Sequence, residues 1–179
     1  LFLLDVLFFF LVGAALLRAW MNHLRVPMQV QPGRFVMAIS DWLVQPLRRV
    51  LPAAVAKGRI DSGSLLAALL LALVHALIVV LLLTGGSADG VGGASMAVAV
   101  VMLALKQLLR TVLQGLLILL IGYAILSWVQ PHSPVMGFLD RLCAPLLRPL
   151  RRVVPLVGGV DLSALVLIIA LQVGLMLLG

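Results

Sequence analysis

Apolar residues gather in four long runs, and the segments between these runs carry nearly all of the charge. The runs cover residues 1–21, 64–83, 111–129 and 162–178. At about 1.5 Å per residue, a helix of about 20 residues crosses the roughly 30 Å hydrocarbon core of a bilayer. The pattern therefore predicts four transmembrane helices.

Residues 33–52 and 133–155, which we call the two elbows, follow a different pattern. Apolar side chains recur there at three- and four-residue spacing, and charged side chains fall on the opposite side. Such a stripe beside a basic face predicts a helix that lies in the plane of the membrane interface. Pro46, Pro145 and Pro149 lack the N–H that continues a helix, so each elbow is predicted to form two short helical pieces.

A basic segment occurs twice, because residues 46–52 read PLRRVLP and residues 149–155 read PLRRVVP. Each copy is followed by a glycine-containing stretch, then by Asp61 or Asp161, and then by an apolar run. An internal repeat of this kind marks one structural unit used twice. The predicted fold class is an all-α membrane protein whose four transmembrane helices form two parallel helix–amphipathic elbow–helix repeats.

The two repeats are predicted to occupy residues 1–84 and 111–179, and each contains two of the spans and one elbow. Residues 85–110 separate the repeats. They comprise a Gly-rich linker, too rich in glycine for regular structure, and a helical lead-in over residues 94–110. We expect this lead-in to lie along the membrane surface or to protrude from it.

Composition and charge place these elements in lipid. Hydrophobic residues make up 64% of the chain and charged residues 11%, against about 45–50% and about 25% in an ordinary soluble domain. The net charge is +7, and most basic residues lie in the elbows. The positive-inside bias predicts cytoplasmic elbows and non-cytoplasmic termini. The charge is therefore attributed to topology and to anionic phospholipid, and no direct nucleic-acid binding is expected.

The repeated pattern resembles the YggT family of small integral membrane proteins. The second copy is the fuller match, with LSW at residues 126–128, PLLRPLRR at 145–152 and GGVDLS at 158–163. The first copy departs from it, with Gln45 at the position of Arg148. The resemblance implies a multi-pass protein of the bacterial inner membrane, in the two-copy form typical of Gram-negative bacteria.

The resemblance implies less about activity than about fold. Chloroplast relatives are implicated in assembling a membrane cytochrome and in organising nucleoids. Bacterial relatives are linked to division-related phenotypes and to osmotic tolerance. These associations define no reaction.

The elbow arginines are candidates for lipid or partner binding, since a guanidinium holds a phosphate through two hydrogen bonds. The alternative is that they only anchor the topology, with nonspecific lipid contact. The residues in question are Arg48, Arg49, Arg148, Arg151 and Arg152.

Ionisable residues at or inside the spans allow two interpretations each. Asp61 and Asp161 either cap the helices they precede or form a carboxylate pair that binds a cation or a proton. His75, in the middle of a span, is either a neutral imidazole bonded to a neighbouring helix or a haem or proton site. Asp5 and Arg18 are 13 positions apart and cannot pair on one helix, so each is expected to reach its own membrane surface.

Catalytic patterns are not apparent. Cys143 is the single cysteine, and the sequence holds no CxxC or HExxH pattern. We therefore expect no enzymatic activity, no cofactor and no metal. The leading hypothesis is a scaffold or assembly factor that binds a membrane complex, or itself, and anionic phospholipid through its elbows. The alternative is a small oligomeric transporter or channel involved in osmotic or ion homeostasis.

Overall fold

The computed structural model describes residues 1–26, 33–50, 61–84, 93–152 and 162–179. In these ranges every regular element is an α-helix, which confirms the all-α class. The helices are α1 (Phe2–His23), α2 (Gly33–Val50), α4 (Ser62–Leu83), α5 (Gly93–Val129), α6 (Pro134–Arg151) and α7 (Leu162–Leu178).

Three helices, α1, α4 and α5, are long and apolar enough to cross a membrane. The first two match the predicted runs at 1–21 and 64–83 closely. The fourth predicted span corresponds to α7, an apolar helix of 17 residues, which at about 1.5 Å per residue is about 25 Å long. The structure therefore supports three spanning helices, and a fourth stays a prediction.

The predicted lead-in and third span form one helix. α5 has 37 residues, about 55 Å at about 1.5 Å per residue. It continues through Lys106 and Arg110, which are exposed and are good helix formers. Its first half does not stand apart as a lead-in, because Ala104 packs with Ala72 and Ala76 in the middle of α4.

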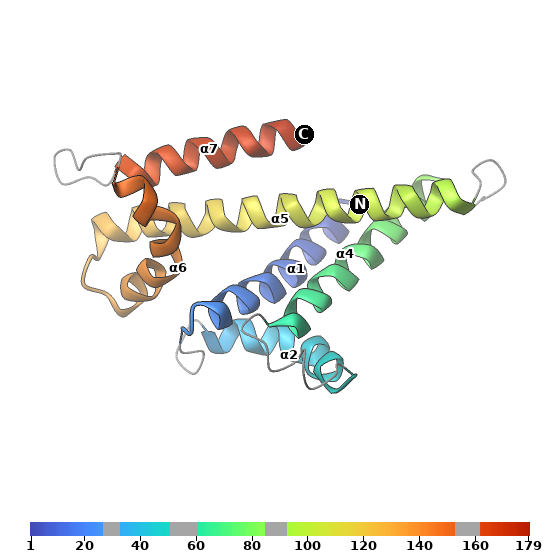
Figure 1. The fold of residues 1–179 in the computed structure, drawn as a ribbon, viewed down its shortest axis with the longest axis horizontal. Coiled ribbons are helices and arrows are strands. Elements are labelled where there is room, and N and C mark those ends of the chain that lie inside the picture. The colour runs from blue at the N-terminus through green and yellow to red at the C-terminus, as the bar shows by residue number, and fades with distance from the viewer. Residues whose placement is uncertain (27–32, 51–60, 85–92, 153–161) are drawn as a thin grey trace.

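The first half of the chain is built on an antiparallel pair, α1 and α4, with α2 across one end and α5 crossing the pair (Figure 1). Small residues line the contacts, including Ala15, Ala67 and Ala68 between α1 and α4. Small side chains let helices approach closely where lipid supplies no hydrophobic drive for association. Where α1 meets α5, a Cβ built on Gly13 would lie 3.9 Å from Thr111 Cγ2.

The second half uses the other end of α5. α7 runs beside α5, and α6 packs on both (Figure 1). The buried residues of this cluster are Leu120, Tyr123, Cys143, Leu147, Ala164 and Leu171. One helix therefore contributes to the cores of both halves.

A third cluster joins the two halves near the elbows. It holds Met21 and Val26 from the end of α1, Val36 from α2 and Leu142 from α6. Trp20 adds a hydrogen bond, since its Nε1 donates to the carbonyl oxygen of Leu142 at 3.2 Å.

A left-handed residue ends α1. Arg25 has φ 54°, its N–H donates to Asn22 O at 3.1 Å, and the N–H of Val26 donates to Met21 O at 3.0 Å. Val26 and Met21 are both buried in the cluster that joins the halves. These are the bonds and the apolar contact of a Schellman motif, in which glycine usually occupies the left-handed position.

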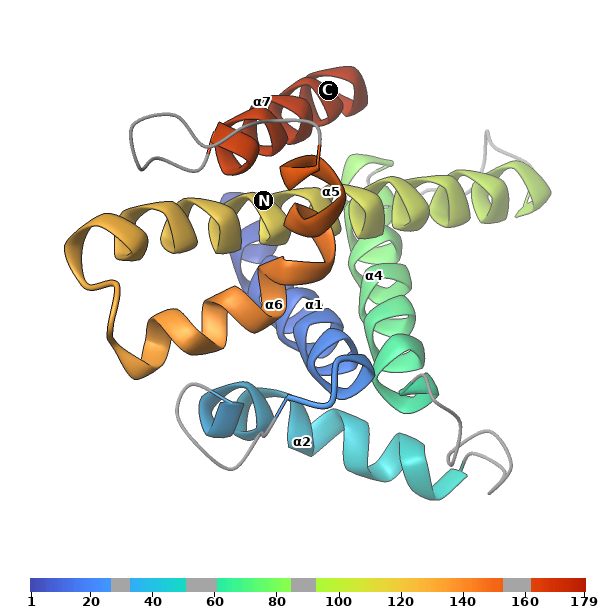
Figure 2. The same cartoon turned by 60° about the vertical axis from the view of Figure 1, so that its left-hand side comes forward.

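The elbows differ from the prediction of two helical pieces each. Pro145 and Pro149 both lie inside the single helix α6, which bends along its length (Figure 2). α6 begins regularly, because the Ser133 side chain accepts from the N–H of Met136 at 3.1 Å and Pro134 occupies the first turn. Pro46 likewise lies inside α2. The prolines therefore bend α6 without dividing it.

Candidate functional site

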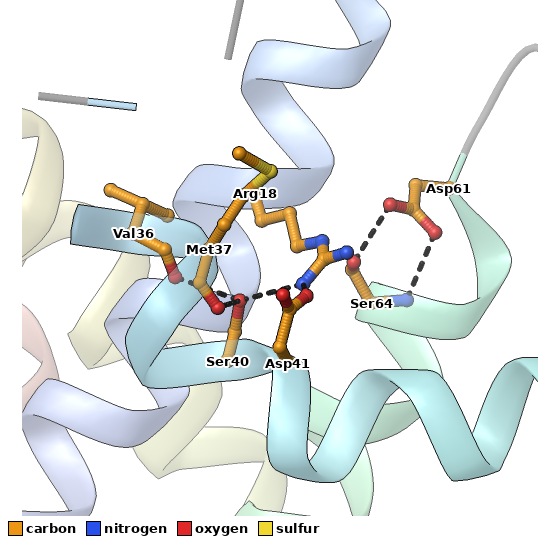
Figure 3. A network of polar contacts seen from close by, with 7 residues as sticks. All are labelled: Arg18, Val36, Met37, Ser40, Asp41, Asp61 and Ser64. Carbon is orange, nitrogen blue, oxygen red and sulfur yellow. Dashed lines mark hydrogen bonds and ion pairs between the residues drawn. The ribbon is translucent and has the colours of Figure 1, made fainter. Parts of the chain in front are cut away.

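A network of polar side chains lies where α1, α2 and α4 meet (Figure 3). α1 contributes Arg18, α2 contributes Ser40 and Asp41, and the start of α4 contributes Asp61 and Ser64. These residues come from three helices that are distant in sequence, and they converge at one end of the α1–α4 pair.

Arg18 is the central cation of this network and is only 6% exposed. Its Nη1 donates to Ser40 Oγ at 2.9 Å and to Asp41 Oδ1 at 2.5 Å. Its Nε is buried and has no hydrogen-bond partner among the described residues. The guanidinium is therefore held from the α2 side.

Ser40 connects this ion pair to the backbone of α2. Its hydroxyl accepts from Arg18 and donates to the carbonyl of Val36 at 2.8 Å, one turn earlier. A serine inside a helix often forms this bond back to the preceding turn. The hydroxyl is thereby fixed with its lone pairs toward Arg18.

Asp61 caps α4. Its Oδ1 accepts from the N–H of Ser64 at 3.2 Å and its Oδ2 accepts from the Ser64 hydroxyl at 2.8 Å. The residue is 5% exposed. This geometry is that of the N-cap interpretation, in which the carboxylate satisfies an orphan N–H at the positive end of the helix. Asp161, its proposed partner in a cation or proton site, lies outside the described residues.

The Arg18–Asp41 pair fastens α2 to α1, one of the helices long and apolar enough to cross a membrane. Charges removed from water are costly unless they are paired, and loss of one partner from a buried pair costs about 3–5 kcal/mol. The Asp41 side chain is 37% exposed, so water lowers the cost on that side. The pair fixes the position of α2 relative to the end of α1.

Sequence reasoning missed this pair. The sequence pattern predicts that Arg18 extends to the membrane surface and that the charged residues of the first elbow, which include Asp41, lie on its polar side. The two residues are 23 positions apart on different helices, so no single-helix spacing links them. The available signal was weak: Asp41 is the one acidic residue in its elbow, and Arg18 lies one turn before the end of its span.

A second polar contact joins α1 to α4. His75 Nε2 lies 2.9 Å from Asp5 Oδ1, and the rings of His75 and Phe8 have centroids 4.9 Å apart. This confirms that His75 bonds to a neighbouring helix. Asp5 does not simply extend to its own membrane surface, because it also faces this imidazole.

The arginines of the second elbow lie on its exposed side. Arg148 and Arg152 are exposed, and Arg151 is exposed while its Nη2 donates to the Tyr123 hydroxyl at 2.6 Å. In the first elbow, Arg48 and Arg49 fall in the last turn of α2, and their side chains lie outside the described residues. Among the described elbow arginines, Arg151 is thus in contact with a residue of α5.

The single cysteine faces inward from α6. Cys143 is 1% exposed, and its Sγ lies 4.0 Å from Leu119 O. Burial raises the pKa of its thiol to about 11, with Asp140 adding to the rise and Arg151 opposing it. The thiol is therefore protonated at neutral pH. Among the described residues, no three or more His, Cys, Asp or Glu side chains group in a way that could hold a metal ion.

Comparisons with known proteins agree with the predicted resemblance. A family model described as CCB3/YggT matches two regions, residues 1–82 and 102–179. The protein named YggT of Escherichia coli (strain K12) is 36% identical over 96% of this chain and 85% of its own length. A Vibrio alginolyticus protein, described as lying in the proC 3' region, is 32% identical over 99% of this chain and 92% of its own length. No solved structure matches the chain.

Proposed function

The chain belongs to the CCB3/YggT family, and on this premise we propose that it is a non-enzymatic scaffold or assembly factor of the bacterial inner membrane. It binds anionic phospholipid and a membrane protein complex, or a second copy of itself, through its basic elbows. The elbows face the cytoplasm and the termini face the other side.

The observation that carries this proposal is the two-sided character of α6. Its buried residues, Leu142, Cys143 and Leu147, face the spans. Arg148 and Arg152 remain exposed on the same helix. An amphipathic helix with an apolar face in the membrane and arginines toward the headgroups binds anionic surfaces, at about 1 kcal/mol per basic residue.

α2 supports the same interpretation for the first elbow. Val36 and Val44 are buried, whereas Arg34 is exposed. The Arg18–Asp41 pair holds this helix at the end of α1. A platform fixed in this way meets the headgroup layer at a set depth, which suits a docking role.

The proposal is tested on the protein extracted in polymer nanodiscs with its surrounding lipid. Arg148→Gln together with Arg152→Gln removes two exposed charges from α6. At about 1 kcal/mol each, the loss should lower enrichment of anionic phospholipid by about tenfold or more. Lipids are measured by mass spectrometry, and co-extracted proteins are identified in the same sample.

The matched control is Lys106→Gln together with Arg110→Gln, which removes two exposed charges from α5. This control should retain lipid and partners at the level of the unmodified chain. If the α6 variant kept both at that level, or if the control lost as much, the elbow would have no binding role.

The proposed orientation has its own test. A cysteine placed in the 85–93 linker, on a Cys143→Ser background, should react with a membrane-impermeant thiol reagent applied to intact spheroplasts. A cysteine at Gly33 should be protected. The opposite result would place the elbows on the outer side and would contradict cytoplasmic docking.

The alternative function, a small oligomeric transporter or channel, is favoured by one observation. Asp5 of α1 contacts His75 of α4, and Arg18 is buried in α1; ionisable groups inside spans often mark pathways. Ion flux in proteoliposomes, lost in Asp61→Asn or Asp161→Asn, would support transport. The absence of flux would leave the scaffold as the better account.

A further inference from the structure

Asp5 and His75 meet across the interface between α1 and α4. The distance from His75 Nε2 to Asp5 Oδ1 is 2.9 Å. The two side chains differ in access, because His75 is 5% exposed and Asp5 is 53% exposed. The pair thus connects a buried imidazole to a carboxylate in the first turn of α1 that the protein leaves half-exposed.

We infer that Asp5 and His75 form a proton-binding site that takes up one proton from the side of the membrane at which α1 begins. With Asp5 ionised and His75 neutral, the pair carries one negative charge. One proton from water makes the pair neutral overall, and an apolar interface favours the neutral form. Because the two groups are 2.9 Å apart, the added proton is shared across one contact and is assigned to the pair.

The second observation is the other imidazole nitrogen. His75 Nδ1 is buried and has no hydrogen-bond partner among the described residues. When Asp5 accepts from Nε2, the tautomer leaves a lone pair on Nδ1. A histidine with only a structural role normally has both nitrogens satisfied when it is buried. The pair therefore offers two places for the added proton, Nδ1 and the exposed carboxylate of Asp5.

The charged residues on the neighbouring helices bond to other groups or are exposed. On α1, Arg18 pairs with Asp41 of α2, 13 residues or about 20 Å along the helix from Asp5. On α5, Lys106 donates to Gly179 O and Arg110 is exposed.

The remaining charged residues on these helices are exposed or undescribed. Arg34 is exposed on α2. The side chains of Arg48 and Arg49 lie outside the described residues. Among the described charged groups, only Asp5 is in contact with the imidazole.

Proton occupancy changes the contact between two spans. The neutral pair holds α1 against α4 without net charge, whereas the unprotonated pair leaves one negative charge beside Phe8 and the apolar interface. The packing of α1 on α4 should therefore respond to the pH of the compartment that Asp5 faces.

The test is a pH titration by NMR of the full chain in lipid nanodiscs, with ¹⁵N-labelled histidine and ¹³C-labelled aspartate carboxyl groups. The His75 and Asp5 signals should change together at one common pH. Asp5→Asn should move the His75 midpoint by about one pH unit or more, because the charge of the partner is gone. The signals of His23 and His132 should not move.

Asp140→Asn is the matched control, since it removes a carboxylate from α6 and should leave the His75 midpoint in place. Asp5→Glu should restore the shared transition, and His75→Gln assigns the signal. Independent midpoints for Asp5 and His75 in the unmodified chain would overturn the inference, even if Asp5→Asn failed to fold. A His75 signal constant from pH 4 to pH 9 would overturn it as well.

Discussion

The two halves of the chain share a basic segment and differ in what holds their helices together. When residues 46–52 are aligned with 149–155, Ser40 stands opposite Cys143 and Asp41 opposite Ala144. Two residues before the tryptophan that closes each span stand Arg18 in the first half and Leu126 in the second. The buried ion pair of the first half is thus replaced by apolar residues in the second.

The difference shows that one elbow motif works with two kinds of attachment. In the first half, α2 is held by a charged pair that needs both partners. In the second half, α6 is held by apolar packing around Cys143 and Leu147, with the Arg151–Tyr123 contact at the surface. In the first half, a single substitution in the ion pair should therefore lower stability strongly. In the second half, the stability should be spread over several apolar residues, each with a smaller effect.

The largest effect is expected from Arg18→Leu, which copies the residue of the second half but leaves Asp41 without its cation. The free energy of unfolding in mixed micelles should fall by about 3 kcal/mol, the lower end for a buried pair, because Asp41 is partly exposed. The double variant Arg18→Leu with Asp41→Ala should recover most of this loss. A double variant as unstable as the single one would show that the pair does not determine the attachment.

Cysteine reactivity compares the two matched positions directly. The pKa of the Cys143 thiol is raised from its ordinary value of 9.0 to about 11, so its thiolate fraction at neutral pH is about 100-fold lower than that of an ordinary thiol. Alkylation by iodoacetamide should accelerate about tenfold per pH unit up to about pH 10. A thiol placed by Ser40→Cys, on a Cys143→Ser background, should react faster, because Arg18 stabilises the thiolate.

Two results would contradict that account. One is a Cys143 alkylation rate that stays constant between pH 7 and pH 9. The other is a slower reaction at position 40 than at position 143, since both side chains are buried and differ mainly in the charge beside them.

Substitutions at Asp61 and Asp161 test whether the two halves also share an aspartate N-cap at the start of their last helix. Asp61→Ala should lower the free energy of unfolding by about 0.5–2 kcal/mol, whereas Asp61→Asn should be mild because asparagine caps nearly as well. The same pair of variants at Asp161 should give the same ranking if the second half begins α7 in the same way. Damage from asparagine equal to that from alanine would show that the negative charge itself is required.

The smallest effect is expected at the end of α1, where the first half has a left-handed arginine. Arg25→Gly relieves a conformation that costs about 1 kcal/mol or more for a residue with a Cβ, but it also raises the entropy of the unfolded chain. The net gain should be below about 1 kcal/mol, seen as a small rise in Tm. Arg25→Ala serves as the control and should give no gain, and a loss of stability with glycine would refute the assignment of the motif.

The helices themselves could be predicted from the sequence because long apolar runs leave few alternatives. The runs at 1–21 and 64–83 became α1 and α4 almost residue for residue. The predicted lead-in and third span form one continuous helix through Lys106 and Arg110, because a change in polarity does not interrupt a helix that contains no proline. In α6, packing against α5 and α7 accommodates two prolines within one bent helix.

The polar contacts could not be predicted, because they depend on how separate helices are rotated and aligned. Asp5 and His75 are 70 positions apart, and they meet only because α1 and α4 run antiparallel in one particular register. The Arg18–Asp41 contact also depends on the turn that follows α1. A hydrophobic pattern indicates which face of each helix is buried, but it does not indicate the axial register in which two helices pack.

The length of α5 has a mechanical consequence. The first half of α5 packs against α4 through Ala104, and its second half packs against α6 and α7 through Leu120 and Tyr123. Because one continuous helix belongs to both clusters, a tilt of α5 in one half should alter its packing in the other. A cut in the chain between α4 and α5 should leave the two halves attached, because α5 packs against helices of both halves.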